Sequence, residues 1–175
     1  PAIGGLGKGH LVREVAALGG IMGLAADAAG IQFRLLNRRK GAAVQGPRTQ
    51  ADRELYRSAV LSAVEATDNL DIVETEVTGL LGVENGACTG VTVADGSEIA
   101  ARAVVITAGT FLDGAIHIGS EVTPAGRVGD KASVHLARQI SGLGLRTGRL
   151  KTGTRARLRN SSIDWSRVDL QHADE

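Results

Sequence analysis

The sequence predicts an α/β fold, and three features indicate it. Apolar residues recur at helical spacing over residues 10–29 and again over residues 50–66. Residues 77–101 instead contain short strand-like runs separated by turn sequences. The run at 103–107 is continuously apolar and rich in β-branched residues, which is typical of a strand buried on both faces of a parallel sheet. Helices alternating with such strands predict the α/β class.

The chain opens with a predicted loop at residues 1–9, because glycines stand there without side-chain periodicity. The helix predicted over 10–29 contains Gly19 and Gly20 in its middle, where we expect a kink or a break. Gly30 is a suitable residue to end that helix.

A short strand is predicted at residues 31–36, followed by a basic loop at 37–48. Thr49 with Asp52 resembles a capping box that would start the second helix, over 50–66. Residues 69–73 are then predicted to return as a strand. The helix is expected to bury the side chains of Leu55, Ala59, Val60, Ala63 and Val64.

Three strand-like runs, at 77–83, 88–94 and 97–101, predict an antiparallel β-meander. They are separated by Asn85-Gly86 and Asp95-Gly96, pairs that favour two-residue hairpin turns of the primed types.

The predicted buried strand at 103–107 ends in the sequence Thr107-Ala108-Gly109-Thr110. Small residues at the carboxyl end of a strand leave room for a ligand in open α/β sheets. The alternative is that Gly109 merely turns the chain.

A helix is predicted near residues 133–140, and a basic segment follows at 146–167, where Asp164 is the single acid. This segment suits binding of nucleic-acid phosphates. Such binding would depend on salt and would not distinguish base sequences. Solvated surface is the alternative interpretation.

Composition limits the possible functions. The chain has 175 residues, of which 43% are hydrophobic, so it is long enough for one ordinary domain. Its net charge of +1 gives no whole-chain reason to invoke nucleic acid or membrane. The single Cys88 excludes an internal disulfide and fits a reduced, cytosolic setting. No apolar run is long enough to span a bilayer, so we expect a soluble protein.

The histidines lie far apart and lack metal-ligand spacing, so no metal site is predicted. The opening glycines fit neither standard phosphate motif: Lys8 is followed by Gly9 where a P-loop has Ser or Thr, and no strand precedes them as in a dinucleotide fingerprint. The chain begins at Pro1, inside this glycine-rich loop, and we expect it to be a piece of a longer protein.

Several long strings resemble the MnmG family, also called the glucose-inhibited division protein A family. They are PAIGGLGKGHLVREV (1–15), ALGGIMGLAADAAGIQFRLLN (17–37), GPRTQADRELYR (46–57), VVITAGTFLDGAIHIG (104–119), AGRVGD (125–130) and LGLRTGRLKTGT (143–154).

The resemblance implies part of a two-dinucleotide-binding, glutathione-reductase-like FAD flavoprotein fold. It implies a cytoplasmic, homodimeric enzyme that adds a carboxymethylaminomethyl or aminomethyl group at C5 of the wobble uridine of tRNA. FAD, NADH as its reductant, methylenetetrahydrofolate as carbon donor and a GTPase partner, MnmE, are implied with it. The catalytic residues are expected outside this chain, so the chain alone is expected to be inactive.

Matching positions imply which residues contact FAD. Val77 and Ser133 correspond to contacts of the family, Thr107, Gly109 and Thr110 to the strand-end segment near the cofactor, and Gly4, Gly5, Gly7 and Lys8 to the loop beside the flavin ring.

The basic segment offers candidates for tRNA binding. They are Arg149, Lys151, Arg155 and Arg157. Position 147 is not a candidate, because the residue there is Thr147 and not an arginine.

Residues 1–119 are expected to form a partial FAD-binding domain that includes the meander, and residues 120–175 a connection and the start of a second domain. The chain departs from the family at Ala16, Ala42, Gln45 and Arg155-Ala156. At Ala42 and at Arg155-Ala156 it lacks an expected proline that would pre-set a turn.

Two other functions stay open. A non-catalytic tRNA-binding or partner-docking domain would use the basic residues of 34–40 and 146–159. A flavin- or nicotinamide-linked oxidoreductase acting on a small molecule is disfavoured, because no fingerprint and no acid–base pair is present.

Overall fold

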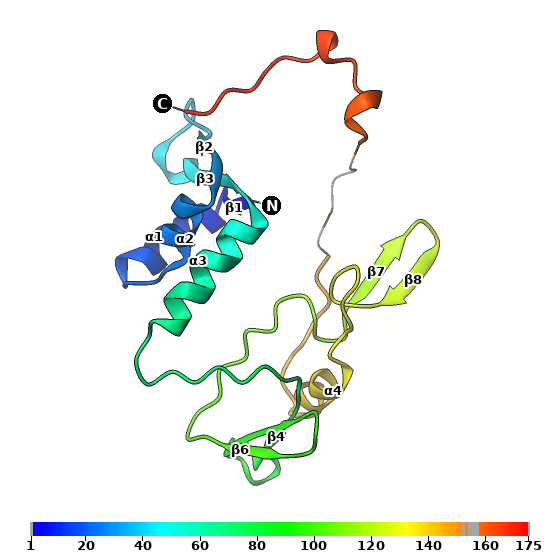
Figure 1. Ribbon diagram of the computed structural model, residues 1–175. Helices are drawn as coiled ribbons and strands as arrows, with labels where there is room; N and C mark the ends of the chain where they lie inside the picture. Colours follow the sequence, from blue (N-terminus) through cyan, green and yellow to red (C-terminus); the bar gives the residue numbers. More distant parts are fainter. Residues whose placement is uncertain (1, 152, 154–157, 175) are drawn as a thin grey trace. The chain divides into compact units, whose positions relative to one another are not determined.

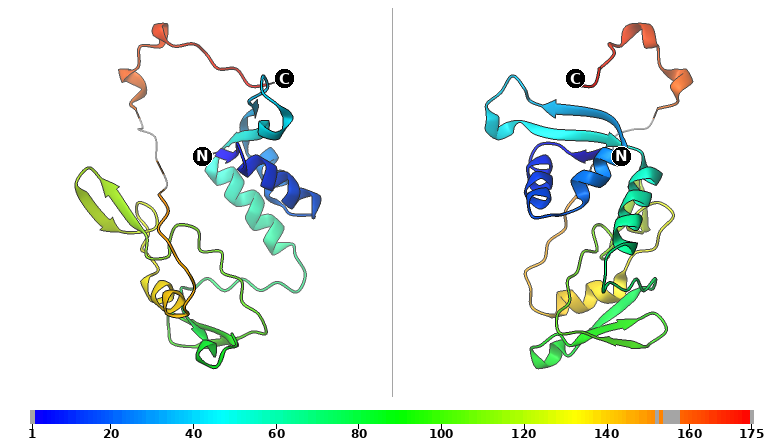
Figure 2. Two further views of the ribbon diagram at one scale, coloured as in Figure 1. Left: turned by 180° about the vertical axis from the view of Figure 1, so that it is seen from behind. Right: turned by 60° about the vertical axis from the view of Figure 1, so that its left-hand side comes forward.

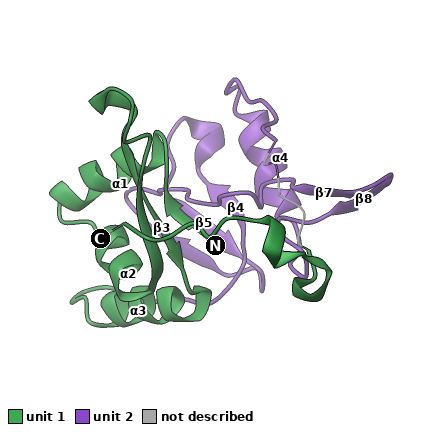
Figure 3. Ribbon diagram, turned by 90° about the horizontal axis from the view of Figure 1, so that it is seen from above, with its two compact units in different colours: residues 1–72, 156–175 green, residues 73–155 purple. Residues whose placement is uncertain are grey.

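The computed structural model describes residues 2–151, 153 and 158–174. The chain divides into two compact units, one of residues 1–72 with 156–175 and one of residues 73–155 (Figure 3). We call them unit 1 and unit 2 and describe each by itself. The expected functional boundary near residue 119 stays a prediction.

Unit 1 contains a three-stranded antiparallel sheet in the order β1-β3-β2 (Figure 1). The strands are β1 (Ala2–Gly4), β2 (Gly30–Leu36) and β3 (Gly46–Ala51). The strand predicted at 31–36 is therefore confirmed, whereas the opening loop and the end of the basic loop prove to contain β1 and β3. Neither sequence alternates apolar and polar residues, so periodicity could not reveal these strands. They form by backbone pairing with neighbouring strands.

The first predicted helix is broken, as its two glycines suggested, into α1 (Lys8–Ala17) and α2 (Met22–Ala28). Gly19 has φ +85°, a left-handed conformation that glycine adopts without strain. At Gly20 an added Cβ would collide with the side chain of Val15. In the right-hand view of Figure 2 both helices lie on the same side of the sheet.

Helix α3 (Arg53–Glu65) starts later than predicted, and the predicted capping box is wrong. Asp52 is itself the N-cap: its carboxylate accepts hydrogen bonds from the backbone N–H groups of Glu54 at 2.9 Å and Leu55 at 3.0 Å. Thr49 belongs to β3 instead.

The expected burial along α3 is also wrong for Leu55, which is 58% exposed, and no residue of this helix is fully buried. The strand predicted at 69–73 does not form, and Leu70, Ile72 and Val73 are about half exposed or more. The buried residues of unit 1 are small: Ala25, Ala26, Ala29 and Ala51. Small side chains let α2 approach β3 closely, and the Asp52 N–H donates to the Ala29 carbonyl at 2.8 Å.

Unit 2 contains the predicted meander, confirmed as antiparallel strands in the order β4-β5-β6. They are β4 (Val77–Leu81), β5 (Gly90–Val93) and β6 (Glu98–Ala100). The turns are not the predicted primed types. Gly96 has φ +85° but Asp95 does not have a positive φ, and the first connection is a 3₁₀ turn, Val83–Asn85, between two left-handed glycines.

Helix α4 (Val134–Gly142) confirms the helix predicted near 133–140. Gln139 anchors it to β4: Oε1 accepts from the Leu80 N–H at 2.5 Å, and Nε2 donates to the Leu80 carbonyl at 2.8 Å. The buried apolar residues of β4, β5 and α4 are Leu80, Val93, Leu136 and Ala137.

The buried parallel strand predicted at 103–107 is wrong. These residues adopt no regular structure, and Val105 is 85% exposed. A fully apolar strand forms only where neighbouring strands pair with it and helices cover both faces, and no strand of the described residues pairs with this segment. The chain continues into an unpredicted hairpin of β7 (Ala115–Ile118) and β8 (Glu121–Pro124).

Short 3₁₀ turns complete the structure, at Ala42–Val44, Asn160–Ser162 and Trp165–Arg167. Of the helices in the described residues, none has the length and apolar character needed to cross a bilayer.

The Gln139 anchor generates a stability prediction. Gln139→Ala leaves both backbone groups of Leu80 without their side-chain partner, and we expect a loss of about 1–3 kcal/mol in the free energy of unfolding. Denaturant unfolding measures it. Arg138→Ala, at the exposed neighbouring position, is the control and should change stability by less than about 0.5 kcal/mol. Equal effects of the two substitutions would contradict the anchor.

Candidate functional site

Two groups of predicted cofactor residues lie in unit 2, and the structure brings Ser133 together with the segment that follows Gly109. The Ser133 N–H donates to the Phe111 carbonyl at 2.9 Å, and the Asp113 N–H donates to the Ser133 carbonyl at 3.1 Å. Thr110 donates from Oγ1 to the Gly126 carbonyl at 2.9 Å. Ser133 and Thr110, which are far apart in the sequence, are therefore parts of one hydrogen-bonded loop cluster.

The features of this cluster fit a phosphate-bearing cofactor. Ser133 is the N-cap of α4, but its side chain makes no capping hydrogen bond. The first N–H groups of the helix and the hydroxyl are thus available to an anion. Gly109 has φ +59°, and an added Cβ there would meet nothing within 4 Å. Thr107 and Gly109 are exposed.

Val77 is the first residue of β4 and pairs with Val93 of β5. A β-bulge follows it, between Val77 and Gly79, and Thr78 Oγ1 donates to the Thr92 carbonyl at 3.2 Å. Since α4 packs on β4 through Gln139, the elements that carry Val77 and Ser133 are neighbours.

The glycine-rich loop belongs to unit 1 and joins β1 to α1. Gly4, Gly5 and Gly7 all have positive φ, at +89°, +104° and +74°. The Gly5 N–H donates to the Pro47 carbonyl at 2.8 Å, and a Cβ added at Gly4 or at Gly9 would collide with that same oxygen. The close approach of β3 therefore requires glycine at positions 4 and 9. A Cβ added at Gly7 would meet nothing within 4 Å.

Lys8 and His10 stand in the first turn of α1. Both ring nitrogens of His10 are buried and have no hydrogen-bond partner among the described residues. Because buried polar groups are nearly always hydrogen-bonded, this imidazole fits a position beside a bound polar group. His10 ends the segment, residues 4–10, that resembles the family loop beside the flavin ring, but the sequence did not single it out as a contact, since a lone histidine in a helix gives no signal.

The basic segment is only partly described. Arg149 Nη1 lies 3.2 Å from Asp113 Oδ2 and donates to the Asp113 carbonyl at 3.0 Å, an exposed pair that ties Arg149 to the Ser133 cluster. Lys151 is exposed. Arg155 and Arg157 lie outside the described residues.

Position 147 contributes no cation to this segment. The residue is Thr147 and not an arginine. It is exposed and belongs to no helix or strand. A neutral hydroxyl side chain cannot supply the charge that phosphate binding by this segment requires. Among the described candidates for tRNA binding, Arg149 and Lys151 therefore remain.

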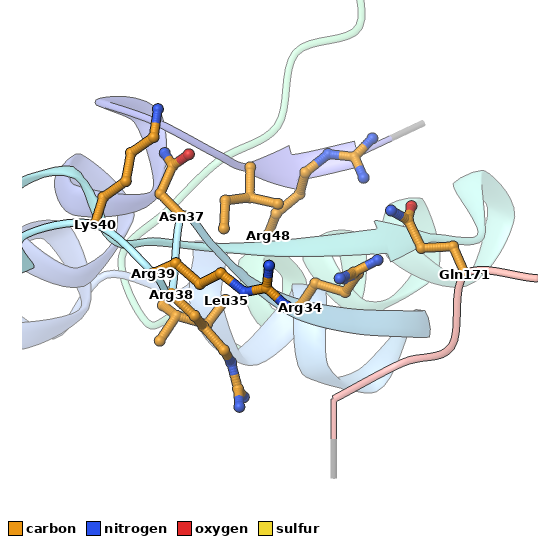
Figure 4. A pocket seen from close by; sticks show the side chains of 9 residues that line it. Arg34, Leu35, Asn37, Arg38, Arg39, Lys40, Arg48 and Gln171 are labelled. Atoms are coloured by element: carbon orange, nitrogen blue, oxygen red, sulfur yellow. The ribbon is translucent and has the colours of Figure 1, made fainter.

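A basic cleft lies in unit 1, with a cavity of about 450 Å³ (Figure 4). Its lining holds five cationic side chains and no acid: Arg34, Arg38, Arg39, Lys40 and Arg48, together with Leu35, Leu36, Asn37 and Gln171. In Figure 4, Arg34 and Gln171 lie toward one end and Asn37 and Lys40 toward the other. The sequence signal for this cleft is the absence of any Asp or Glu between Asp27 and Asp52.

Residues near the end of the chain lie along the free edge of β2. The Asp174 N–H donates to the Phe33 carbonyl at 2.9 Å, and Gln32 Nε2 donates to the Gln171 carbonyl at 2.7 Å. The Asp174 carboxylate accepts from the Leu35 N–H and pairs with Arg38 at 3.1 Å. The Leu35 hydrogen bond, reinforced by the charges of Arg38 and Arg34, lowers the pKa of Asp174 below its ordinary 3.8.

Gly9 gives a stability prediction. Gly9→Ala drives a methyl group into the Pro47 carbonyl, and we expect a loss of about 1–3 kcal/mol in thermal or denaturant unfolding. The matched control is Gly41→Ala, where φ is −59° and an added Cβ meets nothing within 4 Å; it should be neutral within about 0.5 kcal/mol. A neutral Gly9→Ala would show that the loop does not need this close approach.

The Asp174 contact gives a pH prediction. Because its pKa is lowered in the folded chain, the contact stabilises fully above the ordinary pKa of 3.8 and is lost as the pH falls through the lowered value. The Leu35 amide shift in an NMR titration should therefore change with a midpoint below 3.8, and Asp174→Asn should abolish that step. A midpoint at or above 3.8 contradicts the contact.

Comparison with known proteins identifies the family of the chain. The chain matches the family described as "Glucose inhibited division protein A" over residues 1–175. Two crystal forms of GidA from Aquifex aeolicus are each 45% identical to it with a TM-score of 0.87, covering 99% of this chain and 29% of theirs. A GidA-related protein from Thermus thermophilus is 26% identical, covering 55% of this chain and 43% of its own, with a TM-score of 0.49.

The likeness to Aquifex GidA confirms the expected class, a mixed α/β chain of the two-dinucleotide-binding flavoprotein fold. The chain spans less than a third of the length of those GidA structures. Because this match covers residues 1–175, the chain belongs to the glucose inhibited division protein A family.

Proposed function

We propose that this chain is part of an FAD-dependent enzyme that modifies tRNA, adding a carboxymethylaminomethyl or aminomethyl group at C5 of the wobble uridine together with an MnmE-type GTPase. The observation that carries the proposal is the family match over residues 1–175. The 45% identity to Aquifex GidA supports it, since the matched strings include both the glycine-rich loop and the segment after Gly109 that joins the Ser133 cluster.

In this proposal Val77, Ser133, Thr107, Gly109 and Thr110 hold FAD, and Gly4, Gly5, Gly7 and Lys8 lie beside its ring. Ser133 and Thr110 are supported by their shared hydrogen-bonded cluster and Gly109 by the open space around it. Bound FAD supplies the redox chemistry. The chain's own residues bind it through the first N–H groups of α4, the Ser133 hydroxyl and the exposed backbone at Gly109.

The remaining parts of the proposal rest on the family alone. NADH is the reductant, methylenetetrahydrofolate is the carbon donor, and the enzyme works as a cytoplasmic homodimer. Residues 1–119 are assigned to the FAD-binding domain and residues 120–175 to the connection into the next domain, and the catalytic nucleophile is assigned to a part of the enzyme outside this chain.

The full-length protein tests this function. We expect it to purify with one FAD per chain, visible in the absorbance spectrum, and to modify wobble uridine when supplied with the GTPase and both cosubstrates. Mass spectrometry of tRNA nucleosides measures the product. A full-length protein without flavin, or one that leaves the nucleoside unchanged under these conditions, would contradict the proposal.

The isolated chain gives a separate prediction. It should bind FAD weakly or not at all, because the glycines at the β1–α1 connection stand at positions 4, 5, 7 and 9 and lack the G-x-G-x-x-G spacing that holds a pyrophosphate. Isothermal titration of FAD into the purified chain measures this, with the full-length protein as the positive control. Submicromolar binding by the chain alone would overturn it.

A second candidate function is a non-catalytic tRNA-binding or partner-docking domain. The basic cleft of unit 1 favours it, because cations gathered without acids suit a polyanion. Binding of tRNA by the full-length protein that is unaffected by removal of flavin, with no modification, would favour this candidate over the enzyme.

A further inference from the structure

The imidazole of His10 is a buried polar group without a partner. Both of its ring nitrogens, Nδ1 and Nε2, are shielded from solvent and have no hydrogen-bond partner among the described residues. A neutral imidazole carries one N–H donor and one acceptor, and burying such groups unpaired is costly, so proteins rarely do it. A polar group from outside the described residues is therefore expected beside this ring.

His10 differs in this respect from the other residue of the described chain with buried, unpaired side-chain nitrogens, which is Arg34. Arg34 lines the open basic cleft, and the nearby Asp174 carboxylate partly offsets its charge. Among the described residues no ion pair involves His10. The histidine is thus the polar group of unit 1 whose surroundings explain it least.

The position of His10 indicates where its missing partner lies. His10 stands in the first turn of α1, directly after the glycine-rich loop. Side chains of an α-helix lean toward its N-terminus, so the imidazole leans back toward this loop. Gly7 and Lys8 are exposed, and a Cβ added at Gly7 would meet nothing within 4 Å. A ligand therefore has access to the end of the helix toward which the imidazole leans.

The first turn of α1 is held firmly in place. A Cβ added at Gly9 would collide with the Pro47 carbonyl of β3, which shows how closely the two backbones approach. The Gly9 N–H also donates to the Gly5 carbonyl at 2.6 Å. Because this backbone is fixed, the neighbouring His10 needs little ordering to form a hydrogen bond with a ligand.

We propose that His10 is a further cofactor-binding residue, whose imidazole donates a hydrogen bond to a carbonyl of the flavin ring. The inference rests on the proposed function, which places Gly4, Gly5, Gly7 and Lys8 beside that ring. The polar edge of the ring carries two carbonyl acceptors, and a neutral imidazole supplies the matching N–H. The orphaned nitrogens of His10 then have a purpose, since they are left for the cofactor to satisfy.

The test uses the full-length protein and the variant His10→Leu, which removes both nitrogens and retains an apolar side chain of similar size. We expect the dissociation constant of FAD to rise about tenfold, the factor that one lost hydrogen bond produces. The absorbance maxima of the bound flavin should shift, because the lost contact is to the ring itself. Titration calorimetry and absorbance spectroscopy measure the two effects.

Thermal unfolding distinguishes a ligand contact from a structural one. Without FAD, His10→Leu should unfold at the same temperature as the wild type or higher, since it removes buried polar atoms that have no partner. With FAD, the increase in unfolding temperature should be smaller than in the wild type, because the ligand binds less tightly.

Three further variants complete the design. His10→Asn brings an amide near the position of Nδ1 and His10→Gln near that of Nε2, so one of them should restore FAD affinity to within about threefold of the wild type. The variant that does so identifies the donating nitrogen. The matched control is His117→Leu, the same substitution at an exposed histidine of β7, and it should leave affinity and spectrum unchanged.

The outcomes separate this inference from the proposed function. If His10→Leu binds FAD with wild-type affinity and spectrum, the contact is wrong and the proposed function stands. A variant that destabilises the FAD-free protein shows that the partner of His10 belongs to the protein, which overturns the inference, as does weaker binding with an unchanged spectrum. Equal losses in the Leu, Asn and Gln variants overturn it too. A wild-type protein that holds no flavin contradicts the proposed function itself.

Discussion

Strand β3 is the element on which unit 1 depends, and its backbone pairing is the constraint that the other features satisfy. It is the central strand of the sheet, with β1 on one side and β2 on the other. The Pro47 carbonyl accepts a hydrogen bond from Gly5 and leaves no space for a side chain at Gly4 or Gly9. The residue that follows this strand, Asp52, caps α3. The glycine-rich loop, helix α3 and the basic cleft thus all depend on the position of β3.

In unit 2 a single amide side chain has the corresponding role. Gln139 satisfies both backbone groups of Leu80 and so fixes α4 against the meander. The position of Ser133 follows from that contact, because it is the residue from which α4 begins. Hydrogen bonds from Ser133 to Phe111 and from Asp113 to Ser133 then hold the segment after Gly109 beside the helix N-terminus.

Charge distinguishes the two candidate binding regions. The Ser133 cluster offers N–H groups, a hydroxyl and the Arg149–Asp113 pair, whose two charges cancel. The cleft of unit 1 offers net positive charge, with two arginines opposite each other across paired strands. The first environment suits a phosphate group held by N–H groups in one orientation, and the second suits a polyanion held by charge. A cofactor and a nucleic-acid substrate are the pair of ligands that the proposed function requires.

The sequence by itself determined the elements that depend on local rules. The meander, α4, β2 and the break at Gly19 and Gly20 follow from periodicity and from glycine conformation, and the long matched strings determined the family. Tertiary structure decided the rest. Strands β1 and β3 form by backbone pairing that no side-chain pattern records, and the opposition of Arg34 and Arg48 exists only through their register. The apolar run at 103–107 shows the converse: its composition favours a buried strand, yet a strand forms only where partners pair with it, and no described strand does so.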